Sequence, residues 1–136
     1  MVALLIALSV VGFAISTYFT AVSYGWSRAD ARWVPAFCRL DDATCGSIVF
    51  TPQARLLGPP NSLLGQGYYA AILVGAPLGA LSHQPWPMLY LGASLVTVGL
   101  GIVLTYTLLF VTRVPCRLCF TSHAINATIF GLLLMR

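Results

Sequence analysis

The sequence contains no lysine and no glutamate, and its only charged residues are seven arginines and three aspartates. Charged residues make up 7% of the chain, whereas about a quarter is usual in a soluble domain. The mean hydropathy of +0.89 points the same way, so we expect a membrane protein. The few arginines are scattered along the chain and form no basic face, which argues against nucleic-acid binding.

The scarcity of charge leaves three long uncharged blocks, 1–27, 56–112 and 118–135. About 20 apolar residues cross a bilayer core, so the outer blocks hold one span each and the middle block holds two. We therefore predict an all-α membrane protein, a four-transmembrane-helix bundle in which residues 1–136 form a single domain. The predicted spans are 2–23, 63–82, 87–111 and 115–135. A cleavable signal peptide is the alternative for the first block, which lacks a basic start and a clear cleavage site.

The middle block is interrupted by two prolines with polar neighbours, in the stretch Ser82-His83-Gln84-Pro85-Trp86-Pro87. Proline lacks an amide donor and disfavours helical geometry in the residue before it. A tight hairpin is therefore expected between the second and third spans. We expect His83 to be a solvated residue of this hairpin.

The longest polar segment lies between the first two predicted spans, at about 24–62. Long loops in compact domains are usually functional, and the tryptophans of this one favour the membrane interface. We predict that it forms a cap on the bundle, with a short helix in 45–57 interrupted near Pro52. Asn61 and Ser62 are expected to cap the second span by accepting its first amides.

The four cysteines form two pairs that share one side of the predicted bundle. Cys38 and Cys45 lie in the cap segment, and Cys116 and Cys119 lie where a polar link meets the last span. An even number of spans puts both termini on one side and all four cysteines on the other. A dithiol at the mouth of a membrane helix suggests electron transfer, and two communicating pairs form a relay.

The sequence around Cys116 favours redox chemistry at that thiol. The thiolate is the species that attacks a disulfide. Pro115 is expected at the first helical position, which puts Cys116 in the first turn, where free amides and the helix dipole stabilise negative charge. Arg113 and Arg117 add positive charge. We expect Cys116 to face the aqueous cap, and Cys119 to face the lipid side, where a small hydrophobic oxidant reaches it.

Two other uses of four cysteines stay open. Zinc sites usually have paired short spacings, whereas Cys38 and Cys45 are separated by six residues. The second alternative is a pair of static disulfides. A bridge between Cys116 and Cys119 closes a tiny loop and gains little entropy, so reversible chemistry suits that spacing better.

A polar stripe follows Cys119 along the last span. Ser122, His123 and Asn126 stand three, four and seven residues after it, which places them near the same helix face. Polar side chains inside a membrane helix are costly and by default point into the bundle and mark a site. We expect Asn126 to form a hydrogen bond to another helix. For His123 two roles stay open, a hydrogen bond to a backbone carbonyl and a contact with a ligand.

With these residues in place, the chain resembles the vitamin K epoxide reductase family, including its short prokaryotic quinone-linked homologues. The resemblance spans nearly the whole chain, and the Cys-x-x-Cys pair comes last, as it does in that family. It rests on Cys38 and Cys45, on Ser47, and on two motifs. The motifs are Asn61-Ser62-Leu63-Leu64-Gly65 and Cys116-Arg117-Leu118-Cys119-Phe120-Thr121-Ser122-His123-Ala124-Ile125-Asn126.

The resemblance implies a four-helix bundle around a quinone pocket covered by the cap. By matching positions, Cys119 is the thiol that reacts with the quinone, Cys116 exchanges with Cys45, and Cys38 meets the substrate. The implied quinone is of the menaquinone, ubiquinone or vitamin K type, and no metal is implied.

The resemblance also implies which side chains hold the quinone. Asn61 would donate a hydrogen bond to a quinone oxygen, and His123 stands where the animal enzymes have a tyrosine. Histidine still donates a hydrogen bond but also titrates near neutral pH. The implied cofactor-binding set is Ser47, Asn61, Ser62, Leu64 and His123.

The implied activity is that of a membrane thiol-disulfide oxidoreductase that supports disulfide bond formation. Electrons would pass from a thioredoxin-like partner through Cys38 and Cys45 to Cys116 and Cys119 and on to the quinone. The family often carries a fused thioredoxin-like domain, and without one the donor is expected to be a separate protein. The alternatives are a vitamin K epoxide or quinone reductase proper, and a non-enzymatic membrane scaffold with structural disulfides.

Two arguments disagree about orientation in the membrane. Disulfide chemistry favours a cap outside the cytoplasm, in an oxidising compartment. Six of the seven arginines lie on the cap side, which favours the reverse. We expect a multi-pass protein of the cell membrane with the cap and all four cysteines on the extracytoplasmic side.

Overall fold

The computed structural model describes residues 1–28, 48–114 and 116–136, and these residues form helices and turns without any β-strand. The all-α prediction is confirmed for this part of the chain. Its four α-helices are α1 (Val2–Ser23), α2 (Asn61–Gly75), α3 (Trp86–Tyr106) and α4 (Arg117–Leu134).

Three of the described helices are long and apolar enough to cross a membrane. They are α1, α3 with its continuation to Val111, and α4. These helices agree with the predicted spans 2–23, 87–111 and 115–135 to within two residues at each end. The protein is therefore a membrane protein.

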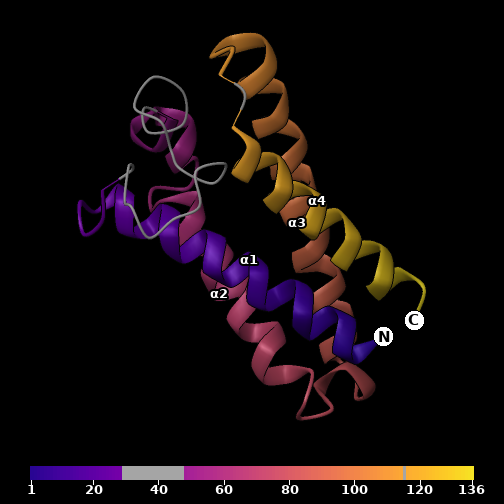
Figure 1. Ribbon diagram of the computed structural model, residues 1–136. Coiled ribbons are helices and arrows are strands. Elements are labelled where there is room, and N and C mark those ends of the chain that lie inside the picture. The colour runs from indigo at the N-terminus through magenta and orange to yellow at the C-terminus, as the bar shows by residue number, and fades with distance from the viewer. Residues whose placement is uncertain (29–47, 115) are drawn as a thin grey trace.

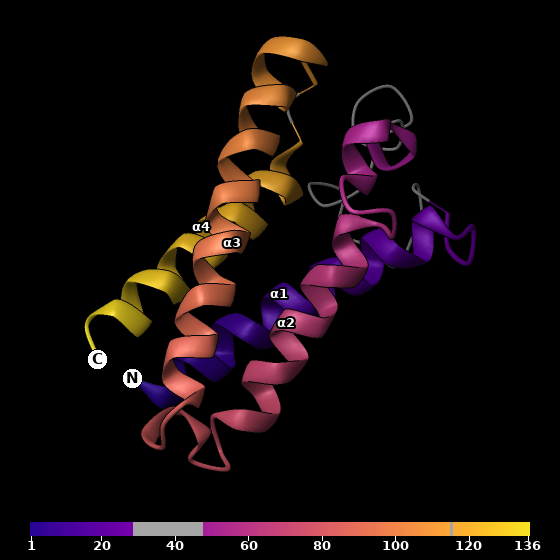
Figure 2. The same cartoon turned by 180° about the vertical axis from the view of Figure 1, so that it is seen from behind.

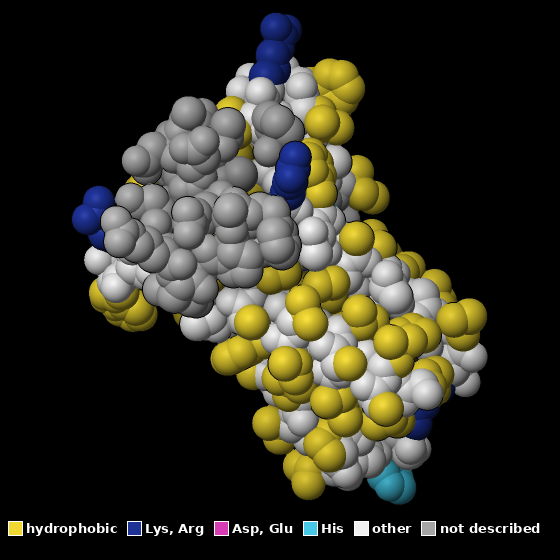
Figure 3. All heavy atoms as spheres, in the orientation of Figure 1, with side chains coloured by type: hydrophobic (Ala, Val, Ile, Leu, Met, Phe, Trp, Pro, Cys, Tyr) yellow, Lys and Arg dark blue, Asp and Glu magenta, His cyan; other side chains and the backbone are white. Residues whose placement is uncertain are grey.

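The outer surface of the helices is apolar, as a lipid-facing surface must be. Large hydrophobic side chains such as Met88, Leu95 and Ile102 are exposed, and Figure 3 shows such side chains spread over the visible face of the bundle. In water, contiguous apolar surfaces of this extent would promote aggregation. Of the arginine side chains that are coloured in the same figure, most lie in the upper half of the molecule.

The α2 helix is shorter than predicted. It ends at Gly75, seven residues before the predicted end of the span 63–82, so this fourth span stays a prediction. Pro77 has no amide hydrogen with which to extend the helix, and Gly79 adopts a left-handed conformation with φ 74°. A 3₁₀ turn, Ala80–Ser82, then leads to the link before α3. At about 1.5 Å per residue, α2 alone is too short for a bilayer core of roughly 30 Å.

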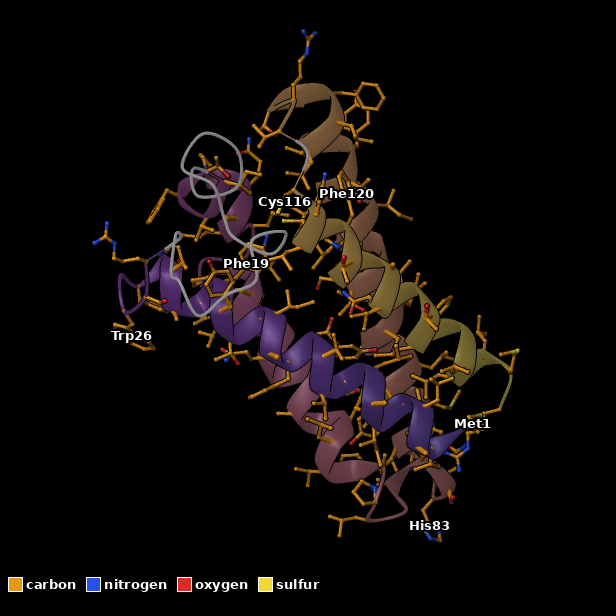
Figure 4. All side chains as sticks on the ribbon, viewed as in Figure 1. Met1, Phe19, Trp26, His83, Cys116 and Phe120 are labelled. Atoms are coloured by element: carbon orange, nitrogen blue, oxygen red, sulfur yellow. The ribbon has the colours of Figure 1, made fainter. Side chains whose placement is uncertain are left out.

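The helices are arranged as two antiparallel pairs, α1 with α2 and α3 with α4, as Figures 1 and 2 show from opposite sides. Both chain termini and the link between α2 and α3 lie at one end of the molecule. The C-terminal end of α1 and the junction between α3 and α4 lie at the other end. Figure 4 accordingly places Met1 and His83 far from Cys116.

The two pairs are joined by a hydrophobic core toward the end that holds the termini. Its buried members come from α1, α2, α4 and the turn after α2, and none is more than 9% exposed. They are Leu5, Tyr68, Tyr69, Ile72, Ala76, Leu81, Ile125 and Ile129. This cluster, here called the terminal core, closes one half of the bundle.

Small residues of α1 allow α2 to approach closely. The ring of Tyr69 occupies the space in which a side chain at Gly12 would lie. One turn further along α1, Ser16 lies against Gly65, and Thr20 donates a hydrogen bond of 2.9 Å to Ser62. Close contact of this kind is what holds helices together in lipid, where no hydrophobic force draws them together.

Gly12→Ala is expected to destabilise the protein. The new methyl group would overlap the Tyr69 ring, and overpacking of this kind costs about 1–3 kcal/mol, more than the gain in helix propensity. Unfolding in detergent should show a lower free energy of unfolding. Gly67→Ala is the matched control, because a methyl group there meets nothing within 4 Å. Equal stability of the two variants would show that the ring of Tyr69 is not seated on Gly12.

Candidate redox site at the start of the last helix

The first of the two α4 cysteines caps the helix instead of lying in its first turn. The helix begins at Arg117, and Cys116 is its N-cap residue with extended backbone, φ −93° and ψ 104°. The Cys116 Sγ accepts a hydrogen bond from the amide of Cys119, with an N···S distance of 3.4 Å. The helix therefore starts two residues later than predicted, and Pro115 lies outside the described residues.

Cys116 is fully buried, so the prediction that it faces an aqueous cap is wrong. It packs with Val22 of α1, with Val49 and with Leu108. Val49 belongs to a 3₁₀ turn, Ile48–Phe50, that follows the predicted cap cysteines in the chain. Phe19 of α1 borders the same group of side chains. We call this group the cysteine cluster.

A cavity of about 440 Å³ lies between the two helix pairs, with residues of all four helices and of the segment 48–60 in its wall. Its surface is mainly apolar. Small-molecule sites are typically apolar cavities of about 300–1,000 Å³ with a few polar groups. Half-buried Cys119 lines this cavity, whereas Cys116 is absent from the described lining. Cys119 also borders the cysteine cluster, so the two cysteines differ in their contact with the cavity, and Cys119 faces the inside of the bundle instead of the lipid.

The polar stripe of α4 lies on the cavity wall. Ser122, His123 and Asn126 line the cavity together with Cys119. Their spacing of three and four residues puts them on one face of the helix, as the sequence predicted.

His123 carries an unpaired polar atom at this wall. Its Nδ1 is buried and has no hydrogen-bond partner among the described residues. The ring packs against Gly101 of α3, where an added Cβ would lie 3.0 Å from that Nδ1. Leaving a buried polar atom unpaired costs about 1–3 kcal/mol. The backbone-carbonyl bond that the sequence left open is not made by Nδ1, and because this atom is buried against α3, a ligand in the cavity would reach it only after a rotation of the ring.

Two neighbouring tyrosines of α2 contribute polar groups that the sequence analysis missed. The Tyr69 hydroxyl donates to Asn126 Oδ1 at 2.6 Å and lies 3.4 Å from Ser122 Oγ. The Tyr68 hydroxyl is 2.6 Å from Ser94 Oγ of α3. Both tyrosines line the cavity. A tyrosine in the middle of a membrane helix is itself a signal, because its buried hydroxyl needs a partner.

Asn61 ties the start of α2 to the preceding segment. Its Nδ2 donates to the Gln53 carbonyl at 2.8 Å, and its Oδ1 accepts from the Leu56 amide at 3.3 Å. The N-cap of α2 is Pro60, with no side-chain cap. The prediction that Asn61 and Ser62 cap this helix is therefore wrong.

The remaining sequence-predicted residues divide into two groups. Asn61, Ser62 and Leu64 line the cavity with Cys119 and His123, so the structure brings these five together. Ser47, Cys38 and Cys45 lie outside the described residues. From residue 48 on, the predicted short helix of the cap is present as two 3₁₀ turns, Ile48–Phe50 and Pro52–Arg55.

The end of α3 is irregular beside the cavity. Thr107–Val111 continues the helix as a π-helical turn, and the Thr112 amide bonds the Thr107 carbonyl at 2.9 Å. Arg113 then takes a left-handed conformation, φ 53°. Such π-turns are frequent at functional sites, and Thr107, Leu108 and Thr112 all line the cavity.

Comparison with known families identifies the chain. The model of the vitamin K epoxide reductase family matches residues 3–134, so the chain belongs to the vitamin K epoxide reductase family. Membership indicates a membrane oxidoreductase with quinone-linked redox chemistry. No curated protein matches the chain. Within residues 1–28, 48–114 and 116–136, no three His, Cys, Asp or Glu side chains are grouped to hold a metal ion.

Gly101→Ala should weaken binding at the cavity. The new methyl group would press on the His123 ring and move it into the cavity. Overpacking by about 1 kcal/mol corresponds to roughly fivefold weaker binding, measurable for menadione by quenching of tryptophan fluorescence. Gly99→Ala is the control on the same helix, because a methyl group there meets nothing within 4 Å. Equal affinities for the two variants would place the menadione away from His123.

Proposed function

We propose that this protein is a quinone-dependent thiol-disulfide oxidoreductase that supports disulfide bond formation. Electrons pass from a separate thioredoxin-like protein through Cys38 and Cys45 to Cys116 and Cys119 and on to a quinone in the membrane. One observation carries the proposal. Cys119 lines an apolar cavity while Cys116 is buried in the cysteine cluster, against the turn that follows Cys45 in the chain.

The cavity fits a quinone ring. Its volume of about 440 Å³ and its mainly apolar surface suit a flat aromatic molecule, and Asn61, Ser62 and His123 add polar side chains to its wall. A bound quinone accepts two electrons and two protons and leaves as a quinol. Asn61, Ser62, Leu64 and His123 are the described residues proposed to hold it.

The proposed thiol chemistry runs in two exchanges. A reduced partner attacks the Cys38–Cys45 disulfide and leaves oxidised, while the two thiols are released. The Cys45 thiolate then attacks Cys116 in the Cys116–Cys119 disulfide, and Cys38 displaces Cys116, which restores the first disulfide and leaves the second pair reduced. Reoxidation of that pair through Cys119 yields the two electrons and two protons that reduce the quinone.

The short path between the two pairs is supported by the packing of Ile48. This residue borders the cysteine cluster and stands three residues after Cys45 in the sequence. Three residues of fully extended chain span at most about 11 Å. The Cys119 amide that points at the Cys116 sulfur stabilises negative charge there, which suits a thiol that must act as leaving group and nucleophile.

We also propose the full four-span architecture with a cap. Residues 61–82 run beside α1 toward the end that holds the termini, as Figures 1 and 2 show, and would complete the fourth crossing. The segment 48–60 contributes Val49, Gln53 and Leu57 to the cavity wall, which supports a cap over the quinone.

The cap and the cysteines are proposed to lie on the extracytoplasmic side, where disulfides persist. Arginines at the same end argue for the reverse orientation. A membrane-impermeant maleimide added to intact cells distinguishes the two. Labelling of Cys38 after mild reduction is expected, and labelling only after permeabilisation would reverse the orientation.

Cys119→Ala should abolish quinone reduction and leave the outer pair active. The variant loses the only proposed electron donor that lines the cavity, whereas Cys38 and Cys45 still exchange with a dithiol. Quinol formation from menadione, followed by absorbance with dithiothreitol as reductant, measures the first effect, and alkylation trapping measures the second. Quinone reduction at the wild-type rate would contradict the assignment. An unchanged thiol state in the wild type when quinone is supplied would indicate a scaffold instead.

Reduction of vitamin K epoxide is the second candidate, because the matching family takes its name from that reaction. The same thiols would supply the two electrons. A mass-spectrometric assay that offers either menaquinone or its epoxide, with dithiothreitol as reductant, separates the two activities. Conversion of menaquinone alone supports the primary proposal.

A further inference from the structure

Tyr69 is held rigidly at the boundary between the terminal core and the cavity. It is 1% exposed, and its ring lies where a side chain at Gly12 would lie, while Gly65 of its own helix borders the ring at 3.9 Å from the Cβ position. The ring is therefore seated against α1. Its hydroxyl is held next to α4, where it bonds to Asn126.

That fixed hydroxyl determines how the Asn126 amide is oriented. The hydroxyl donates to Asn126 Oδ1 at 2.6 Å, and Ser122 Oγ lies 3.4 Å from the same hydroxyl. An asparagine side chain has one acceptor oxygen and two N–H donors. With the oxygen occupied, the Nδ2 donors are the groups that Asn126 has left to offer, and none of the hydrogen bonds found among the described residues uses them.

Asn126 stands on the cavity wall one turn beyond His123, whose Nδ1 has no partner among the described residues. Spacing of three residues puts the two side chains on the same face. The cavity wall thus carries the unused Nδ2 donors of Asn126, whereas the buried Nδ1 of His123 lies against Gly101 of α3. Carbonyl oxygens are the natural partners of N–H donors in an otherwise apolar site.

We propose that Asn126 binds a carbonyl oxygen of the quinone through Nδ2, and that Tyr69 is the positioning residue that holds the amide in the orientation required. This inference rests on the proposed quinone function and adds to it a donor and its support. Tyr69 acts through Asn126 and does not touch the quinone oxygen itself.

Tyr69→Phe tests the inference, with Tyr90→Phe as the control. Each variant removes one tyrosine hydroxyl that donates a hydrogen bond to a neighbouring helix, to Asn126 from Tyr69 and to the Ala71 carbonyl from Tyr90, but Tyr90 is not among the residues that line the cavity. For Tyr69→Phe we expect KM for menadione to rise by about two- to tenfold, the usual effect of one lost hydrogen bond, with kcat nearly unchanged. Tyr90→Phe should keep the wild-type KM.

Infrared spectroscopy of bound, carbonyl-labelled ¹³C menadione gives a readout that a purely structural role would not move. Loss of the hydrogen bond should shift one carbonyl stretching band to higher frequency in Tyr69→Phe and in Asn126→Leu. The double variant should resemble Asn126→Leu alone, because the two residues act as a unit.

The outcomes separate this inference from the proposed function. An unshifted band in Tyr69→Phe, a shift equal to that of Tyr90→Phe, or additive effects in the double variant would overturn the inference. If wild-type protein does not transfer electrons to menadione, the proposed function fails. The infrared bands of menadione bound to the oxidised protein still test the Asn126 donor in that case.

Discussion

The seating of Tyr69 on Gly12 is the contact on which the rest of the structure depends. The Tyr69 ring of α2 fills the space that a side chain at Gly12 of α1 would occupy. Its hydroxyl donates a hydrogen bond of 2.6 Å to Asn126 of α4. Three helices are thereby fixed at the edge of the terminal core, and beyond this edge the two helix pairs enclose a cavity instead of packing solidly. Lipid provides no hydrophobic force between helices, so such close contacts and interhelical hydrogen bonds set where the cavity begins.

The N-cap at Cys116 separates two thiols that are only three residues apart. Because α4 starts after Cys116, this residue stays in the cysteine cluster next to the 3₁₀ turn Ile48–Phe50. Cys119, in the first turn, is on the cavity wall. In the proposed relay, the first sulfur would exchange with protein thiols and the second would contact a small molecule. The position at which α4 begins therefore gives the two cysteines the different surroundings that the proposed relay requires.

The predictable parts of the fold and site were those set by local sequence. Absence of charge located α1, α3 and α4, and helical spacing located the stripe from Cys119 to Asn126. The end of α2 was misjudged because apolar sequence continues past Pro77, which stops the helix. Tyr69 was missed because its partner on α4 lies 57 residues away, and pairing over that distance is decided by tertiary packing. The roles of Cys38, Cys45 and Ser47 stay predictions, since they lie outside the described residues.

The central claim is that a quinone occupies the cavity between Cys119 and Tyr69. Photolabelling of the membrane-embedded protein with an azido-naphthoquinone, followed by peptide mass spectrometry, tests it directly. The account predicts labels on the stretches 61–69 and 119–126, and competition by excess menadione. Labels confined to lipid-facing residues such as Leu95 and Ile102, without competition, would contradict it.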